Sequence, residues 1–463
     1  MSAQRSDSKA ALLVQGVWPA TAAPLPAGRA ELTRVLSVHS AKLSARILRE
    51  LPSVEIIGAC ALAPLLLLRC EQGQSARILE ELAEWPQVAR AEATLPEEAM
   101  ERLEPLRTPI IEATDPCTAG FVDLGAPLIA SAMLEDRGKR FGGALRPARQ
   151  SENLVPNHSD SVLAAFLETL GPGRTPRCIF ESLDRSAGPF SWLAAIDRLF
   201  CRGASVVNLS YGRLALERES GWGGLEWGAE LLCQGSGGTV VAAAGRINEG
   251  LSSGESLYLP ASAPHVLAAA DELRAKATAP RQQAAKLLLA SSSDPYGGRR
   301  GSSYSAPRIS ALAVQAYDEL PREARDCETV LALLLAAAKP SIPGALSPGF
   351  PDSGRLTRII AGGAYRRGSK NGRLLLPATP GAPTRIAVSW LESEVEPLLR
   401  ASSALEQQIL RRSEQWMVLD VLTGDVELEL RDLSGPWSLA FSPLSPEEFQ
   451  ISRKGVGRGR RAS

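Results

Sequence analysis

The sequence, 463 residues long, has no apolar run long enough to cross a membrane. Its longest such run, Ala59 to Leu68, contains a proline and ends at Arg69, whereas a membrane-spanning helix needs about 20 apolar residues. The segment from Met1 to Ala10 is polar, and no apolar stretch follows it at the right place for a secretory signal. From these absences we expect a cytoplasmic protein without a membrane partner.

An excess of charge and a set of paired cysteines are absent as well. Lys and Arg together number 51, as do Asp and Glu, and this balance gives no general attraction to nucleic acid or to anionic membranes. The seven cysteines are an odd number without a Cys-x-x-Cys pair, which argues against a zinc finger and a complete disulfide framework. We therefore expect no nucleic-acid partner, no metal site and buried free thiols.

What the sequence does contain is typical of a soluble globular chain, with 44% hydrophobic and 22% charged residues. Its length predicts two or three domains. We expect a flexible leader at 1–30, a small domain at 31–95 and a linker at 96–118. Strands at 32–38, 54–57, 65–70 and 88–93 and helices at 40–51 and 75–85 would give the small domain the β-α-β-β-α-β order of a ferredoxin-like α+β unit.

Short apolar runs and helical patterns alternate through residues 119–340. This alternation predicts an α/β domain with a doubly wound, mostly parallel sheet. A linker follows at 341–354, and then a β-rich, sandwich-like accessory domain at 355–452, for docking or for stability alone. We expect that domain to contain a strand at Thr357–Ile360 and a helical segment at Glu392–Arg412. Residues 453–463 should be a disordered basic tail.

The sequence is also poor in histidine, with three, so few residues can supply a catalytic imidazole. Two of them suit surface or packing roles, but His158 leads directly into a helical pattern, where α/β sheets place catalytic groups. Asp123 ends an apolar strand, and Ser303 stands where a Gly-rich loop becomes an apolar helix. Their chain order, Asp, His, Ser, is one of the three convergent orders of the serine-protease triad.

Around these residues the sequence resembles the subtilisin-like serine protease family, the subtilases. The family's serine block, Gly-Thr-Ser-x-Ala/Ser-x-Pro, is matched with Ser302 in place of Thr, and its Asp-x-Gly block and part of its histidine block are also matched. Three further matches are the strand before the substrate-binding segment, the Val-Val-Ala-Ala-Gly block and the Pro-Ala-Ser-x-Pro-x-Val segment. In chain order the blocks are Asp123–Gly125, His158–Ala164, Val206–Gly212, Val240–Arg246, Pro260–Val266 and Gly301–Pro307.

The resemblance implies a sheet of subtilisin type and a serine endopeptidase that works through an acyl-enzyme intermediate. Ser303 would be the nucleophile, His158 its base and Asp123 the residue that orients the imidazole. The small domain at 31–95 looks like the family's prodomain. We expect it to dock on the catalytic domain and to lay the linker 96–118 near the nucleophile, so that the enzyme is autoinhibited or controlled by a regulatory protein partner.

The resemblance also assigns the binding residues. A protein or peptide substrate would add a strand beside Ser210, Tyr211 and Gly212. At the oxyanion hole Arg246 stands where the family has an Asn side chain, and Asn248 follows two residues later.

Some features depart from the family or stay open. The change at the oxyanion hole leaves a second interpretation, a degenerate subtilase that binds peptides or proteins without hydrolysing them. Pro307 should fall in the first turn of its helix, where a missing N–H does little harm. Many members of the family use calcium, but the sequence has no acidic loop cluster with the expected spacing, and we expect no cofactor.

Overall fold

The computed structural model describes residues 9–18, 29–94, 117–125, 127, 156–171, 174, 176–183, 187–214, 224–245, 257–271, 287–297, 299–341, 347–368, 372–376, 383–390, 398–402, 408–412, 416–422, 426–431 and 436–454. Arg246, Asn248, nearly all of the predicted linker 96–118 and most of the predicted tail lie outside these residues. No described helix is long and apolar enough to span a membrane. All seven cysteines are buried and free of disulfides, as expected.

The N-terminal unit is an antiparallel sheet with two helices among its described residues. Its strands lie in the order β2-β3-β1-β4, the ferredoxin-like order that the sequence predicts. In chain order its elements are β1 (Lys9–Gly16), α1 (Arg29–Glu50), β2 (Glu55–Ala59), β3 (Leu65–Glu71), the short 3₁₀ helix η2 (Gln72–Gln74), α2 (Ser75–Ala83) and β4 (Val88–Thr94).

The start of this unit corrects the prediction. Residues 9–16, expected in a flexible leader, form a strand between β3 and β4, and residues 32–38, expected to be a strand, belong to α1. The run Leu12–Val14 is fully buried, because β1 is paired on both edges. The buried apolar side chains of α1 recur at helical spacing: Leu32, Leu36, Leu43 and Ile47.

The central domain is the expected α/β domain. Among the described residues, its sheet has six parallel strands in the order β12-β11-β9-β7-β5-β6. The strands are β5 (Thr118–Asp123), β6 (Arg177–Ser182), β7 (Ala204–Leu209), β9 (Thr239–Ala243), β11 (Leu267–Ala270) and β12 (Leu287–Leu289). Two shorter strands, β8 (Arg213–Leu214) and β10 (Tyr258–Leu259), pair outside this sheet. The sequence did not predict β12.

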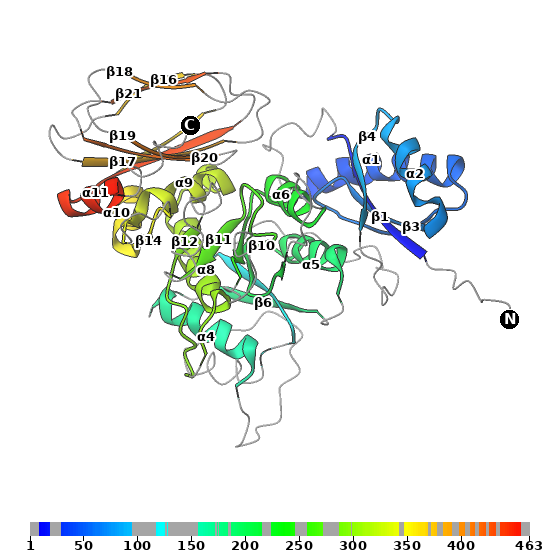
Figure 1. Cartoon of the computed structure of the whole chain (residues 1–463), viewed down its shortest axis with the longest axis horizontal. Coiled ribbons are helices and arrows are strands. Elements are labelled where there is room, and N and C mark those ends of the chain that lie inside the picture. Colours follow the sequence, from blue (N-terminus) through cyan, green and yellow to red (C-terminus); the bar gives the residue numbers. More distant parts are fainter. Residues whose placement is uncertain are drawn as a thin grey trace.

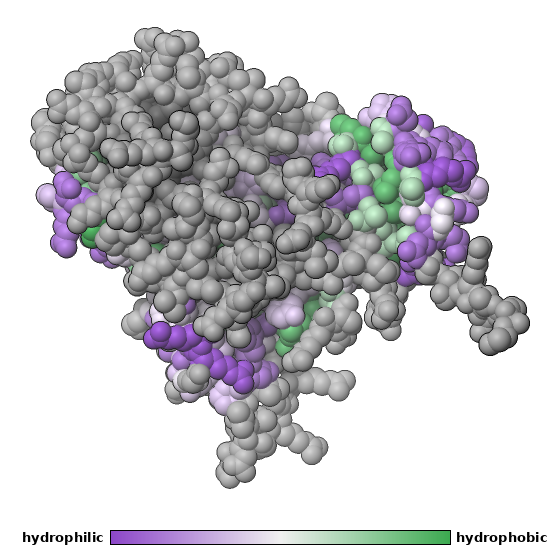
Figure 2. All heavy atoms as spheres, in the orientation of Figure 1, coloured by the Kyte–Doolittle hydropathy of each residue, from purple (hydrophilic) through white to green (hydrophobic). Residues whose placement is uncertain are grey.

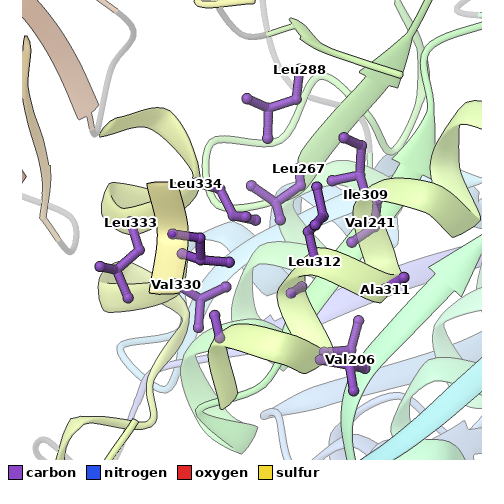
Figure 3. Close-up of a cluster of buried hydrophobic side chains, with 14 of the residues drawn as sticks. Val206, Val241, Leu267, Leu288, Ile309, Ala311, Leu312, Val330, Leu333 and Leu334 are labelled. Carbon is purple, nitrogen blue, oxygen red and sulfur yellow. The ribbon is translucent and has the colours of Figure 1, made fainter. Parts of the chain in front are cut away.

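Helices cover both faces of the central sheet. One face packs against α4 (His158–Leu170), α8 (Ser302–Glu319) and α9 (Cys327–Ala337), and the other against α5 (Pro189–Cys201) and α6 (Gly224–Ser236). Neighbouring strand residues serve opposite faces: Val206 and Val241 join the core beside α8 and α9 (Figure 3), whereas Val207 and Val240 join the core beside α5 and α6. Burial on both faces explains why these strands are mostly apolar.

The N-terminal unit docks on α5 and α6 (Figure 1). Apolar side chains from the two domains form one continuous core, with Leu13 and Leu65 on one side and Leu193 and Leu232 on the other. On the visible face in Figure 2, hydrophobic residues gather over the strands of the N-terminal unit and hydrophilic residues over α2. The predicted docking of the small domain is therefore present in the structure.

The C-terminal domain contains two antiparallel sheets, drawn as two layers in Figure 1. Within the described residues, one sheet has the order β15-β22-β17-β20-β19 and the other the order β16-β21-β18, in keeping with the predicted sandwich. The strands are β15 (Tyr365–Gly368), β16 (Gly372–Leu376), β17 (Pro383–Trp390), β18 (Leu398–Ser402), β19 (Gln408–Arg412), β20 (Trp416–Leu422), β21 (Val426–Arg431) and β22 (Trp437–Pro443).

Three segments near this domain differ from the prediction. Thr357–Ile360 lies in helix α10 (Ser353–Ala361), which Asp352 caps by accepting a hydrogen bond from the Arg355 N–H. The segment 392–412, expected to be helical, contains β18 and β19, which gain their hydrogen bonds from neighbouring strands. Helix α11 (Pro446–Lys454) extends into the first residues of the predicted tail. The predicted linker also contains structure: β13 (Ala338–Lys339) pairs with β14 (Phe350–Pro351).

A buried ion pair joins the C-terminal domain to the central one. Arg385 on β17 and Asp420 on β20 are both fully buried, with two hydrogen bonds of 2.7 and 2.8 Å between them. The same guanidinium donates to the backbone carbonyls of Ala338 and Pro348. One side chain thus bonds both within the sandwich and to the end of α9.

Candidate active site

The structure brings Asp123 and His158 into direct contact at the carboxyl edge of the central sheet. Asp123 is the last residue of β5 and is 2% exposed. The imidazole Nδ1 of His158 lies 3.0 Å from Asp123 Oδ1 and 2.9 Å from Oδ2, and the backbone N–H of Leu124 donates to Oδ1 at 2.7 Å. A carboxylate in this position fixes the ring's orientation and favours the tautomer with a proton on Nδ1.

The first turn of α4 holds His158 rigidly. Asn157 caps the helix by accepting from the Asp160 N–H, and the Asp160 carboxylate accepts in return from the Asn157 N–H, which is a capping box. The Ser159 hydroxyl donates to the Gly125 carbonyl at 2.8 Å. Gly125 has φ of +100°, a conformation that suits glycine. The turn after Asp123 is thus tied to the helix that carries the imidazole.

Ser303 is the second residue of α8 and directly precedes Tyr304. It is partly exposed, whereas its neighbours Ser302 and Tyr304 are buried. The Tyr304 ring lies against the His158 ring, with 5.7 Å between the ring centroids. Ser303, the nucleophile predicted from the sequence, is therefore covalently adjacent to Tyr304, whose ring contacts the imidazole. A hydroxyl at a helix N-terminus also lies where the helix dipole favours negative charge.

Ser302 binds the loop that follows β9. Its hydroxyl donates to the Gly245 carbonyl and accepts from the Gly245 N–H, both at 3.0 Å. Gly245 has φ of +94°, a conformation that suits glycine. Residue 246, the predicted oxyanion position, is the next residue along the chain. Gly245, the residue before Arg246, is thus held beside Ser302, the residue before Ser303.

The predicted substrate-binding segment lies beside Ser303. The buried Ser210 hydroxyl donates to the backbone carbonyl of Ser303 at 2.8 Å. Tyr211 is 40% exposed and stacks on Trp192 of α5, with 5.6 Å between the ring centroids. Gly212 follows before β8 begins at Arg213.

Pro307 lies later in its helix than predicted. It is the sixth residue of α8, counted from Ser302, and so lies beyond the first turn. The backbone N–H that it lacks is the one that would bond to the carbonyl of Ser303.

A parallel sheet covered by helices on both faces, with Asp123 and His158 paired at its carboxyl edge, is the arrangement expected of a subtilisin-type fold. The fold is of the subtilisin type. The solved structures similar to this chain include two maturation proteases. The patellamide maturation protease PatA is 23% identical with a TM-score of 0.39, covering 54% of this chain and 99% of its own. The prenylagaramide maturation protease PagA is 21% identical with a TM-score of 0.38, covering 54% and 95%.

Searches with the sequence itself gave no match. No protein-family model and no curated protein matches it.

Sequence reasoning missed three residues of the site. Asn208 donates to the Ser210 hydroxyl at 2.9 Å, Ser302 binds Gly245, and Tyr304 contacts the imidazole. Their only sequence signal was their position inside the matched blocks. Within the described ranges, no group of three or more His, Cys, Asp or Glu side chains is arranged to hold a metal ion.

Proposed function

We propose that the protein is a serine endopeptidase that hydrolyses peptide bonds through Asp123, His158 and Ser303. The observation that carries the proposal is the contact of Asp123 with His158 Nδ1 at 2.9 Å, beside the start of the helix that bears Ser303. This contact leaves the opposite ring nitrogen, Nε2, as the proton acceptor that a serine nucleophile requires.

In the proposed reaction, His158 Nε2 takes the proton of the Ser303 hydroxyl as Oγ bonds to the carbonyl carbon of the substrate. Asp123 stabilises the imidazolium that results. Collapse of the tetrahedral intermediate breaks the C–N bond, and the imidazolium gives its proton to the leaving amine. Water then repeats the sequence on the acyl-enzyme and releases the acid.

The negative charge of the intermediate needs hydrogen-bond donors. The Ser303 N–H at the start of α8 is one donor, supported by the helix dipole. We assign the second donor to the loop after Gly245, with Arg246 as the first candidate and Asn248 as the other. In subtilisin, which belongs to the family that this sequence resembles, removing one such donor costs about 10²–10³ in turnover.

The same proposal places a protein or peptide substrate along Ser210, Tyr211 and Gly212 as an added strand. It also keeps the N-terminal unit as the inhibitory part of the chain, with the linker 96–118 across the active site and a regulatory protein partner or a cut that relieves it. The large buried contact of this unit with α5 and α6 supports a lasting restraint. A protease that works in the cytoplasm, as we propose, needs such control.

The test uses the full chain with a recognition site for a site-specific protease inserted within 96–118. Hydrolysis of fluorescein-labelled casein is measured before and after the linker is cut. We expect activity after cutting, a loss of about 10⁴-fold or more in Ser303→Ala and His158→Ala, and unchanged activity in the exposed control Ser293→Ala. A folded, cut wild type as inactive as Ser303→Ala would refute the endopeptidase and favour the peptide-binding scaffold.

A further inference from the structure

One backbone carbonyl of α8 lacks its usual hydrogen-bond donor within the helix. In an α-helix the carbonyl of one residue accepts from the N–H four residues later. For Ser303 that residue is Pro307, which has no N–H. The carbonyl of the proposed nucleophile therefore needs a donor from outside the helix.

Ser210 supplies that donor. Its hydroxyl lies 2.8 Å from the Ser303 carbonyl oxygen, and the Ser210 side chain is buried. Asn208 Nδ2 donates to the same hydroxyl at 2.9 Å. Because a hydroxyl has a single proton, the bond received from Asn208 leaves that proton directed at Ser303.

The side-chain oxygen of Asn208 also bonds to α8. Its Oδ1 accepts from the Ser310 hydroxyl at 3.0 Å, and Ser310 lies one turn beyond the proline. Asn208, Ser210 and Ser310 are all buried, so water does not compete for these bonds. Asn208 and Ser210, at the end of β7, thus bond to α8 on both sides of Pro307.

We infer that Ser210 is a positioning residue for Ser303, replacing the helix hydrogen bond that Pro307 removes. The inference rests on the proposed function. The Ser303 carbonyl shares a peptide plane with the Tyr304 N–H, and the Tyr304 ring contacts His158. A tilt of this plane would therefore change the placement of Ser303 Oγ relative to the imidazole, and small errors in such placement cost rate.

Ser210 also lies in the proposed substrate-binding segment, so loss of activity in Ser210→Ala alone would not separate positioning from binding. Pro307→Ala provides the separation, because it restores an N–H that can donate to the Ser303 carbonyl. If Ser210 acts by positioning, the double variant Ser210→Ala/Pro307→Ala regains what Ser210→Ala loses. If Ser210 acts only on substrate, the proline substitution restores nothing.

The experiment measures the second-order rate constant for labelling by a fluorophosphonate, with the linker-cut full chain as the enzyme. We expect Ser210→Ala to react about tenfold more slowly, Ser210→Thr to keep most of the rate because it keeps the hydroxyl, and the double variant to return to within about threefold of Pro307→Ala. The matched control is Ser75→Ala, which removes a hydroxyl bonded to a backbone carbonyl in the N-terminal unit, and its rate should not change.

The outcomes separate the inference from the proposed function. A wild type that is not labelled at all overturns both. A labelled wild type with a double variant as slow as Ser210→Ala overturns the inference alone, as does Ser210→Ala with an unchanged rate. If Pro307→Ala does not fold, Pro307→Ser restores the same N–H and takes its place.

Discussion

Arg29 provides the sharpest test of how the N-terminal unit is held. It is the first residue of α1, where its positive charge opposes the dipole of its own helix. It is nevertheless 5% exposed, and it donates to the Phe200 carbonyl at 2.8 Å and to the Ser236 carbonyl at 2.9 Å. These carbonyls lie at the C-terminal ends of α5 and α6, where a cation is favoured. Arg29 thus caps two helices of the other domain.

The size of the effect follows from these contacts. A hydrogen bond with a charged partner contributes about 1.5–3 kcal/mol, and Arg29 also lies 5.6 Å from the centre of the Phe200 ring, in reach of a cation–π interaction. Gly203 keeps one bond to the Phe200 carbonyl when the arginine is lost. We therefore expect Arg29→Met to lower the free energy of unfolding by about 3 kcal/mol.

The assay is urea unfolding of the full chain, followed by far-UV circular dichroism. With a slope of about 2 kcal/mol per M, the first transition should move to lower urea by about 1.5 M. The matched control is Arg34→Met on the same helix, an arginine that is 73% exposed and paired with Glu31 on the surface, and it should move the transition by less than about 0.3 M. If Arg29→Met unfolds like this control, the double cap does not hold the domains together.

Other predictions test the interface, the linker and the sandwich. Burial raises the pKa of Asp197 to about 6, although two backbone N–H groups of the N-terminal unit donate to it. The folded protein thus holds this proton more tightly than the unfolded chain does, so the free energy of unfolding should fall by up to about 3 kcal/mol as pH rises from about 4 to 6. In urea titrations Asp197→Asn should show a smaller fall over this pH range. An equal fall in the variant would contradict the role given to Asp197. Cutting an inserted site within 96–118 should raise casein hydrolysis, whereas unchanged activity would remove the case for inhibition by the linker. Asp420→Ala should lower the unfolding free energy by about 3–5 kcal/mol because it leaves the Arg385 charge buried, and a thermal-melting shift no larger than that of a surface substitution would contradict this.

The sequence predicted the central domain well because its signals there are local. Each buried strand is a short apolar run, and each covering helix has a helical pattern between two such runs. Strand β12 was missed because its three residues, Leu287–Leu289, are too few for a periodic pattern. Thr357–Ile360 was misread as a strand because its β-branched residues outweighed the Asp352 cap, which becomes visible only as a hydrogen bond.

The N-terminal boundary was missed for a different reason. The run Ala10–Val14 is short and follows a polar segment, so it looks like part of a leader. It becomes a strand through pairing with β3 and β4, which are more than fifty residues away. Contacts so distant in sequence leave no local pattern.

In the candidate site, too, local sequence features could be predicted and contacts between distant segments could not. The residue types and chain order of Asp123, His158 and Ser303 could be predicted, since the matched blocks preserve them. The bond from Ser210 to Ser303 could not, because it depends on how β7 and α8 meet in space. Pro307 lies about half a turn beyond the predicted first turn, and at that depth in the helix its missing N–H leaves the Ser303 carbonyl without a helical partner.

The proposed function makes Ser303 a nucleophile that His158 activates. Its most direct test is peptide mass mapping of the linker-cut protein after reaction with a fluorophosphonate, in which a P–O bond to the serine forms, the P–F bond breaks and fluoride leaves with the proton passing to the imidazole. We expect one phosphonyl group, on the peptide containing Ser303, and none in His158→Ala over the same time. A phosphonyl group on a different serine, or equal labelling of His158→Ala, would contradict it.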